Sequence, residues 1–313
     1  MLPIAILGAG LAGLSAAQAL TAAGRRVRLI DKGRAAGGRL ATRRIEHEGA
    51  NHRFDHGAQY LRAEGKGFAA LLDTAATQPW PDAARRVPLP GMSTLGRHLA
   101  QGLDIANGRH ASALTRTDAG WRVAHLDATL VRPGRPLPAV EPKVEGPFGA
   151  VLVTFPAEQA IALLPNSFAA PLATIRYSPC WTVLAAFAER LPLPDTLRDH
   201  DEIGWAARDS SKPGRDATQE NWVIQAGPEF SQAHLDDAPE AVIAAMLAAL
   251  DAPAPLFAVA HRWRYSLLET ALGAPCLWDS ALGLGYASDG CLSGRAEAAW
   301  DSGQALAARV LAA

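Results

Sequence analysis

The feature that most constrains this 313-residue chain is a glycine-rich turn near its start. Residues 3–7 (P-I-A-I-L) form a short apolar run, as expected of a strand that is buried on both faces. G-A-G-L-A-G follows at positions 8–13, and the Ala- and Leu-rich residues 14–23 favour a helix that Gly24 ends. Residues 27–30 (V-R-L-I) predict a second strand, which closes on Asp31. This order predicts a Rossmann-type βαβ unit.

The spacing of the three glycines has a physical reason in a dinucleotide-binding turn. Gly8 permits the tight turn, Gly10 lets the backbone approach a pyrophosphate, and Gly13 lets the helix pack closely on the strand. The helix N-terminus offers free N–H groups to phosphates, and Asp31 can accept hydrogen bonds from ribose hydroxyls. The residues expected to line the phosphates are Gly8, Gly10, Leu11, Ala12 and Gly13. The alternative is a glycine-rich turn in an unrelated α/β unit.

A second glycine pair follows the βαβ unit. Gly37 and Gly38, followed by Arg39, resemble the second signature of the glutathione-reductase-like FAD enzymes, and particularly of their amine-oxidase-like branch. In those enzymes the glycines let the backbone pass close to the cofactor and the arginine approaches its phosphates. The resemblance therefore implies FAD as the cofactor. A solvated basic patch is the alternative for Arg39.

The last part of the chain carries a third segment of this kind. Residues 283–312 indicate a strand, an acid at Asp289, a turn and a helix from about Arg295. In the same FAD families an Asp at this position binds the ribitol chain, and the helix N-terminus points at the flavin pyrimidine. The family usually has Gly before this Asp, where this chain has Ser288. Because cofactor segments lie at both ends of the chain, we expect a discontinuous FAD domain with the substrate domain inserted.

Composition and charge exclude several classes of protein. The chain is 49% apolar and 19% charged, which argues against disorder, and its net charge of −1 gives no basic field for nucleic acid or an anionic membrane. Residues 1–24 carry no charge, but no basic segment precedes them and three glycines interrupt them, so we expect no membrane span and no signal sequence. Three separated cysteines and no metal-ligand cluster favour a reducing, cytoplasmic location without a bound metal.

Several segments, spread in family order over nearly the whole chain, resemble the renalases and in particular their bacterial relatives. They are residues 37–44 (G-G-R-L-A-T-R-R), 54–60 (F-D-H-G-A-Q-Y), 90–95 (P-G-M-S-T-L), 210–215 (S-S-K-P-G-R), 261–265 (H-R-W-R-Y) and 293–303 (S-G-R-A-E-A-A-W-D-S-G). The resemblance implies a flavoprotein with the p-hydroxybenzoate-hydroxylase-like fold that holds FAD noncovalently. We therefore expect an α/β protein with a Rossmann-type FAD-binding domain (1–75, 92–165 and 268–313). Its inserted α+β substrate domain (76–91 and 166–267) is expected to contain a mostly antiparallel sheet.

The resemblance also implies roles for single residues. Asp31 and Lys32 would meet the adenosine ribose, and the backbone of Ala111 would meet adenine. The other FAD contacts that it implies are Gly38, Arg39, Gly57, Ala58, Gln59, Tyr60, Asp289, Glu297 and Ala298. No catalytic acid or base is assigned, since the dihydronicotinamide substrate that the resemblance implies can give up a hydride without one. Residues 131–147, rich in proline, are expected to form an exposed excursion without helix or central strand.

The substrate side offers weaker patterns. Candidate substrate contacts are Tyr177, Trp181, His261 and Trp300, with core packing as the alternative for each tryptophan. His261 and Trp263 should share one face of a strand. Arg176, Arg208 and Arg264 are candidates for binding substrate phosphates. Lys212, in the loop S-S-K-P-G-R, is expected to anchor that loop and not to reach flavin N5.

Three functions remain open at this stage. The first, implied by the renalase resemblance, is oxidation of a dihydronicotinamide, an isomeric form of NAD(P)H, with hydride passing to flavin N5 and O2 reoxidising the flavin to give H2O2. The second is oxidation of a small amine, as in the wider amine-oxidase superfamily. The third is a flavin-binding module without turnover.

Overall fold

The computed structural model describes residues 1–132, 134–200 and 202–313, which divide into two compact units. Unit 1 comprises Met1–Arg39, Leu95–Arg176 and Thr270–Ala313, and unit 2 comprises Leu40–Thr94 and Tyr177–Glu269. The boundaries expected from the sequence differ, because they assigned residues 40–75 to the first domain and 166–176 to the second. Residues 40–75 fall in unit 2 because they begin with a hairpin whose Phe54 packs on the unit 2 sheet. Residues 166–176 fall in unit 1, where 166–172 form a helix.

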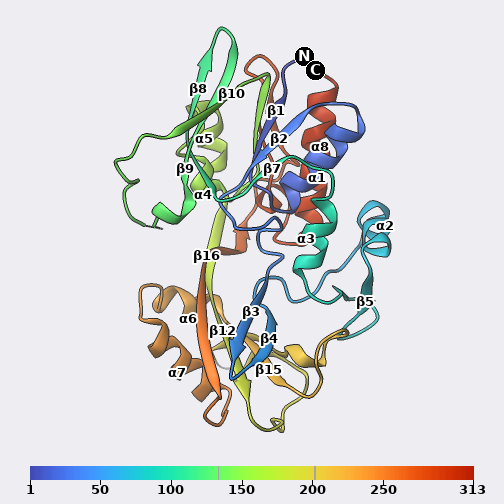
Figure 1. Ribbon diagram of the computed structural model, residues 1–313, viewed down its shortest axis with the longest axis vertical. Helices are drawn as coiled ribbons and strands as arrows, with labels where there is room; N and C mark the ends of the chain where they lie inside the picture. The colour runs from blue at the N-terminus through green and yellow to red at the C-terminus, as the bar shows by residue number, and fades with distance from the viewer. Residues whose placement is uncertain (133, 201) are drawn as a thin grey trace. The chain divides into compact units, whose positions relative to one another are not determined.

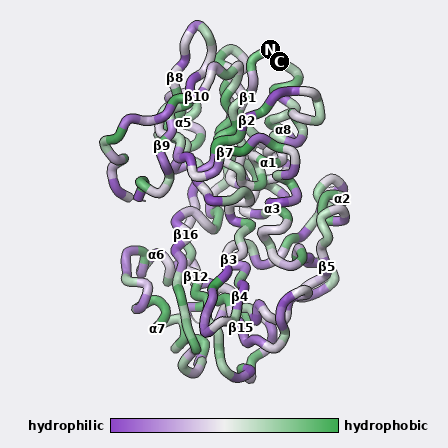
Figure 2. The backbone as a smooth tube through the Cα atoms, viewed as in Figure 1, coloured by the Kyte–Doolittle hydropathy of each residue, from purple (hydrophilic) through white to green (hydrophobic). Residues whose placement is uncertain are grey.

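The core of unit 1 is a mainly parallel sheet in the order β17-β18-β11-β1-β2-β7. Its strands are β1 (Ile4–Leu7), β2 (Val27–Ile30), β7 (Ile105–Ala106), β11 (Ala150–Val153), β17 (Leu277–Asp279) and β18 (Leu284–Tyr286). Only the edge pair β17 and β18 is antiparallel among the described pairings of this sheet. Figure 2 shows hydrophobic colours along the central strands, and every residue of β1 and β11 is buried.

Helices α1 (Leu11–Ala22) and α8 (Ala296–Leu311) pack side by side in unit 1, although they come from opposite ends of the chain (Figure 1). Gly303 makes this close approach possible, because a Cβ there would lie 2.2 Å from the carbonyl oxygen of Ala12. Ser15 Oγ donates a hydrogen bond to the carbonyl oxygen of Trp300 (2.7 Å). The C-terminal segment is thereby fixed on the helix that follows the glycine-rich turn.

The remaining elements of unit 1 include a small antiparallel sheet in the order β10-β9-β8. These elements are α3 (Ser93–Leu99, entered from unit 2), β8 (Arg109–Thr117), β9 (Gly120–Asp127), β10 (Lys143–Phe148), α4 (Ala157–Ala160) and α5 (Asn166–Leu172). The prediction that residues 131–147 contain no central strand agrees with β10, which is an edge strand where Pro147 is tolerated. Residue 133 of that segment lies outside the described residues.

Unit 2 contains a sheet in the order β13-β14-β15-β12-β16, antiparallel in each pairing that is described. Its strands are β12 (Arg176–Phe187), β13 (Thr196–His200), β14 (Ile203–Arg208), β15 (Glu220–Ala226) and β16 (Phe257–Thr270). The other elements are β3 (Thr42–His47), β4 (Ala50–Asp55), α2 (Lys66–Thr74), β5 (Thr77–Pro79), β6 (Arg86–Pro88), α6 (Pro228–Ala233) and α7 (Pro239–Ala249). The expectation of a mainly antiparallel sheet in the inserted domain agrees with this arrangement.

The unit 2 sheet is covered on both faces, which explains why β12 is buried along nearly its whole length. One face packs against α7 through Val242 and Met246. The other face packs against the β3–β4 hairpin, where Phe54 meets Leu184 and Val223.

Candidate functional site

The glycine-rich turn of unit 1 has the tight geometry that its spacing predicts. Gly8 adopts a φ of +109°, which disfavours a side chain, and a Cβ on Gly13 would lie 2.0 Å from the carbonyl oxygen of Gly8. Thr154, at the end of β11, donates through Oγ1 to the carbonyl oxygens of Leu7 and Gly8 (3.0 Å each). The role of Thr154 could not be predicted from the sequence, because nothing local to this residue marks a partner more than a hundred residues away.

Gly10 differs from its neighbours because its backbone faces open space. No atom lies within 4 Å of the position that a Cβ would take there. Gly10 is also the N-cap of α1, and this helix end has neither a side-chain cap nor an acidic residue in its first turn. The first N–H groups of α1 are therefore available to an anion. Gly38, with a φ of +57°, lies against Gly10: a Cβ there would be 3.3 Å from the Gly10 Cα atom.

Asp31 closes the other side of this turn. Its carboxylate accepts hydrogen bonds from the backbone N–H groups of Ala9 (2.7 Å) and Gly33 (2.6 Å). The start of β8 lies beside it, because the Arg109 N–H donates to the Asp31 carbonyl oxygen (2.8 Å), which brings the strand containing Ala111 to this edge. Lys32 donates to the Gln159 side chain (2.7 Å).

An ion pair joins the second and third sequence segments. Arg39 Nη2 lies 2.6 Å from Asp289 Oδ1, and the Asp289 side chain is only 5% exposed. Glu297 and Ala298, in the first turn of α8, are also buried. Three motifs that are far apart in sequence thus belong to one compact unit: the glycine turn, the Gly38–Arg39 segment and the Asp289–α8 segment.

Gly57, Ala58, Gln59 and Tyr60 belong to unit 2, where they follow β4. Gln59 is buried, and its side chain accepts a hydrogen bond from Lys212 Nζ (3.3 Å). The Gly57 carbonyl oxygen accepts one from Gln225 (2.9 Å). Side chains from distant segments, Lys212 and Gln225, therefore help to hold this segment in place.

Lys212 itself lies in a fully buried ionic cluster, in agreement with its expected role as an anchor. Its ammonium group is 2.6 Å from Asp209 and 3.4 Å from Asp55, and Arg215 contacts the same two carboxylates. The two positive and two negative charges balance. Burial alone raises the pKa of the Asp55 carboxyl, but Lys212 and Arg215, with a hydrogen bond from Thr42, outweigh it and hold that pKa below its usual value.

The predicted substrate residues separate into different environments. Trp181 is buried in the hydrophobic core of unit 2, and its indole N–H donates to the His234 carbonyl oxygen (2.9 Å), which favours the core-packing alternative for this residue. Tyr177 is buried at the start of the unit 2 part of β12, and Trp300 lies on α8 of unit 1. His261 and Trp263 share a face of β16, as predicted, with ring centroids 4.4 Å apart.

The three arginines expected to bind substrate phosphates are engaged elsewhere. Arg208 is buried and paired with Glu220 (2.9 Å), and Arg264 pairs with Asp236 (3.4 Å). Arg176 donates to nearby backbone carbonyl oxygens. The carboxylate partners of Arg208 and Arg264 come from other segments of the chain, so the sequence could not show that these two charges are already compensated.

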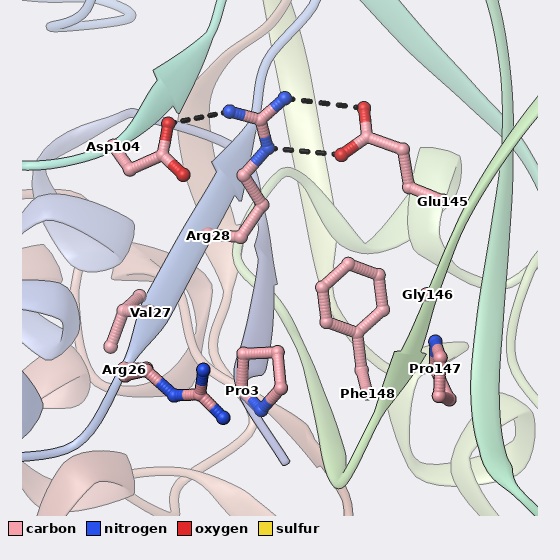
Figure 3. Close-up of a pocket in the computed structure, with 9 residues that line it drawn as sticks. All are labelled: Pro3, Arg26, Val27, Arg28, Asp104, Glu145, Gly146, Pro147 and Phe148. Atoms are coloured by element: carbon pink, nitrogen blue, oxygen red, sulfur yellow. Dashed lines mark hydrogen bonds and ion pairs between the residues drawn. The ribbon is translucent and has the colours of Figure 1, made fainter.

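Figure 3 shows a surface pocket in unit 1 whose lining residues do not include the glycine turn. It is lined at the amino-terminal ends of β1 and β2, whereas the turn follows the carboxyl end of β1. Its Arg28 is held between Asp104 and Glu145, with 3.0 Å from Arg28 Nε to Glu145. Because ligands of open α/β sheets bind at the carboxyl ends of the strands, this pocket is not the candidate cofactor site.

Within the described residues there is neither a membrane-spanning helix nor a cluster of metal-ligating side chains. No helix there is both long enough and apolar enough to cross a bilayer. Nor do three or more His, Cys, Asp or Glu side chains of the described part of the chain gather as a metal site would require.

Comparison with known proteins gives the fold. The profile of a family described as "NAD(P)-binding Rossmann-like domain" matches residues 6–75. A structure from Exiguobacterium sp. 255-15, assigned as a protoporphyrinogen oxidase, is similar at a TM-score of 0.73 and 13% identity, covering 100% of this chain and 99% of that chain. Putrescine oxidase bound to putrescine is similar at 0.72 and 14%, with 100% and 99% covered. Cyclohexylamine oxidase from Brevibacterium oxydans IH-35A is similar at 0.73 and 12%, with 99% and 98% covered. The chain therefore has the mixed α/β fold of these oxidases over its whole length, with a Rossmann-like domain at its start.

Proposed function

We propose that the protein is an FAD-dependent oxidoreductase that holds its cofactor noncovalently. The observation that carries this proposal is the union of three motifs in unit 1, with the Arg39–Asp289 ion pair (2.6 Å) joining two of them. A nicotinamide-binding domain needs the glycine turn and the acid at its second strand. A nicotinamide-binding domain does not require the Gly38–Arg39 segment or a buried Asp289 before a helix N-terminus. Their presence favours a flavin dinucleotide.

The residues present fit this cofactor. The uncapped first turn of α1 and the open space at Gly10 would take the pyrophosphate, and Asp31 has acceptor capacity left for ribose hydroxyls. Asp289 would bind the ribitol chain, and the N-terminus of α8 with Glu297 and Ala298 would lie at the pyrimidine end. The resemblance alone supports contacts with FAD for six further residues: Lys32, Ala111, Gly57, Ala58, Gln59 and Tyr60. When bound, FAD supplies a two-electron acceptor that O2 can reoxidise.

We further propose a dihydronicotinamide as substrate. The substrate ring gives up a hydride and becomes an aromatic nicotinamide cation, while O2 takes up that hydride and one solvent proton to become H2O2. Aromatisation drives the step, so the protein needs to bind and orient the ring and does not need a base. The support is the resemblance to bacterial renalases in the segments quoted above, together with the oxidase fold.

Oxidation of a small amine is the second candidate. It is favoured by the similarity in fold to putrescine oxidase and cyclohexylamine oxidase, which at 12–14% identity concerns the fold only. The third, a flavin-binding module without turnover, would share the cofactor site but lack any reductant.

Two measurements test the proposal in order. The cofactor released from the purified protein by heat should be FAD, identified by mass spectrometry, and a different cofactor or none would refute the first step. The FAD-loaded protein is then mixed anaerobically with dihydronicotinamide isomers and, separately, with putrescine and cyclohexylamine. We expect loss of visible flavin absorbance with the dihydronicotinamides. Loss of visible flavin absorbance with the amines only would instead support oxidation of a small amine.

A further inference from the structure

A group of polar and aromatic side chains lies at one end of the interface between the β3–β4 hairpin and β16 in unit 2. Its members are Arg43, His56, His261 and Trp263. Directly paired residues of an antiparallel hairpin point to the same side, and Arg43 pairs with Phe54. Phe54 points at the sheet, where it packs with Leu184 and Val223. Arg43 therefore lies on the sheet side of the hairpin. Arg44, the next residue, lies on the opposite side and is exposed.

Aromatic rings of β4 and β16 line this interface in register. His52 meets Phe257 with ring centroids 4.9 Å apart, and two residues further along each strand the apolar layer continues with Phe54 and Val259. It then gives way to His56, whose ring is 5.1 Å from His261 and 5.2 Å from Trp263. The layer thus changes from apolar to polar at the end that leads directly into residues 57–60.

The polar end carries an uncompensated positive charge. No carboxylate of the described residues lies within ion-pair distance of Arg43, which is half-buried. Burial, with His261 and Arg43 adding to it, lowers the pKa of His56 to about 4, and burial and Arg43 lower that of His261. Both imidazoles are therefore neutral near pH 7 and can donate N–H groups without adding charge. Nδ1 of His56 is buried and has no hydrogen-bond partner in the described part of the chain.

These four side chains favour one class of ligand. A guanidinium group binds a phosphate in bidentate fashion, and neutral imidazoles supply further donors. The rings of His261 and Trp263 offer flat apolar surface beside them, with the Trp263 indole fixed by its hydrogen bond to the His56 carbonyl oxygen (2.9 Å). A protonated alkylamine would instead be repelled by Arg43 and would find no carboxylate in this group of four.

We propose that Arg43, with His56, His261 and Trp263, binds the phosphate-bearing part of the substrate and so selects dihydronicotinamide nucleotides over phosphate-free ribosides and amines. This assignment rests on the proposed oxidation of a dihydronicotinamide. Arg43 takes the place of Arg208 and Arg264, whose charges are paired with carboxylates, and of Arg176, whose guanidinium donates to backbone carbonyl oxygens.

The test compares two probes that differ by one phosphate: dihydronicotinamide mononucleotide and dihydronicotinamide riboside. Rapid anaerobic mixing with the FAD-loaded protein gives the dissociation constant and the limiting rate of flavin reduction for each. The variant is Arg43→Met, which keeps the aliphatic stem. The matched control is Arg44→Met on the opposite side of the same strand. Binding of the oxidised mononucleotide and riboside, followed through the perturbation of flavin absorbance, gives a readout that does not need turnover.

In the wild type and in Arg44→Met we expect the mononucleotide to bind about ten-fold or more tightly than the riboside, as loss of a charge-assisted hydrogen bond implies. In Arg43→Met this ratio should fall to near one through weaker mononucleotide binding, with the limiting rate and the thermal unfolding midpoint unchanged. An unchanged ratio in Arg43→Met, or equal binding of both probes to the wild type, would overturn the assignment of Arg43 while leaving the proposed function intact. Failure of every dihydronicotinamide to reduce the wild-type flavin would overturn both.

Discussion

Substitution of Gly10 by alanine separates the two roles that a glycine in this turn can have. Gly10 has a φ of −74° and a ψ of −178°, extended backbone that alanine adopts readily, and nothing lies within 4 Å of the added Cβ. The free protein should therefore change little in stability, because the reduced entropy of the unfolded chain (about 0.4–1 kcal/mol) offsets the weaker N-cap preference of alanine. The same methyl group would occupy the space that a pyrophosphate needs, so we expect FAD affinity to fall about ten-fold or more.

Gly13→Ala is the matched contrast, because there the added Cβ would meet the protein itself. It would lie 2.0 Å from the carbonyl oxygen of Gly8 and 2.6 Å from Thr154 Oγ1, and the backbone contact cannot be relieved by a side-chain rotation. Moving α1 away from β1 is the remaining response, and overpacking of this kind costs about 1–3 kcal/mol. The two variants should therefore differ in the stability of the cofactor-free protein and agree in losing FAD.

The assay uses cofactor-free protein prepared by reversible denaturation. Urea unfolding followed by circular dichroism gives the free energy of unfolding, and quenching of flavin fluorescence on addition of FAD gives the dissociation constant. If Gly10→Ala binds FAD as tightly as the wild type, the turn does not hold the pyrophosphate. If Gly10→Ala destabilises the free protein as much as Gly13→Ala does, the open space at Gly10 has another explanation.

Three further predictions follow from the same structure. Lys212→Met leaves the buried Asp55 and Asp209 with an unbalanced negative charge and should reduce the free energy of unfolding by about 3–5 kcal/mol in urea titrations, and a change below about 1 kcal/mol would contradict the ionic cluster. Asp289→Asn removes the charge facing Arg39 and should weaken FAD binding with little change in circular dichroism, whereas undiminished affinity in the fluorescence titration would exclude Asp289 from the site. For His56 the folded pKa lies below the unfolded value of 6.5, at about 4 because of burial, so the unfolded chain takes up the proton first and stability falls by roughly 1–3 kcal/mol as the pH drops from 6.5 to 4. An NMR titration of the His56 ring with a midpoint near 6.5 would refute that environment.

The sequence predicted the elements of unit 1 that depend on local chemistry. The strand, turn, helix and strand around Gly8, Gly10 and Gly13 are formed as expected, because glycine conformation and helix propensity act over a few residues. The alternation on β16 also placed His261 and Trp263 on one face correctly. The mixed α/β class followed from these patterns and is confirmed by the similar oxidase structures.

What the sequence could not predict depends on contacts between distant segments. Alternation cannot identify the core-facing side of β12, since that strand is buried on both faces, so the sequence could not decide between core packing and a substrate contact for Trp181. Lys212 lies in a loop whose sequence indicates exposure to solvent. Its burial becomes possible because its charge is balanced by Asp209 and by Asp55, which comes from a distant segment. The meeting of Arg39 with Asp289 is likewise set by tertiary structure alone.

The central claim is that bound FAD accepts a hydride from a dihydronicotinamide and passes the electrons to O2. The most direct measurement is an anaerobic titration of the FAD-loaded protein with a dihydronicotinamide mononucleotide isomer, followed by admission of oxygen. We predict that one equivalent of substrate abolishes the visible absorbance of one equivalent of flavin and yields one equivalent of nicotinamide mononucleotide. Oxygen should then restore the absorbance and yield one equivalent of H2O2. Flavin absorbance that is unchanged by any dihydronicotinamide isomer, or that is bleached by amines instead, would contradict the account.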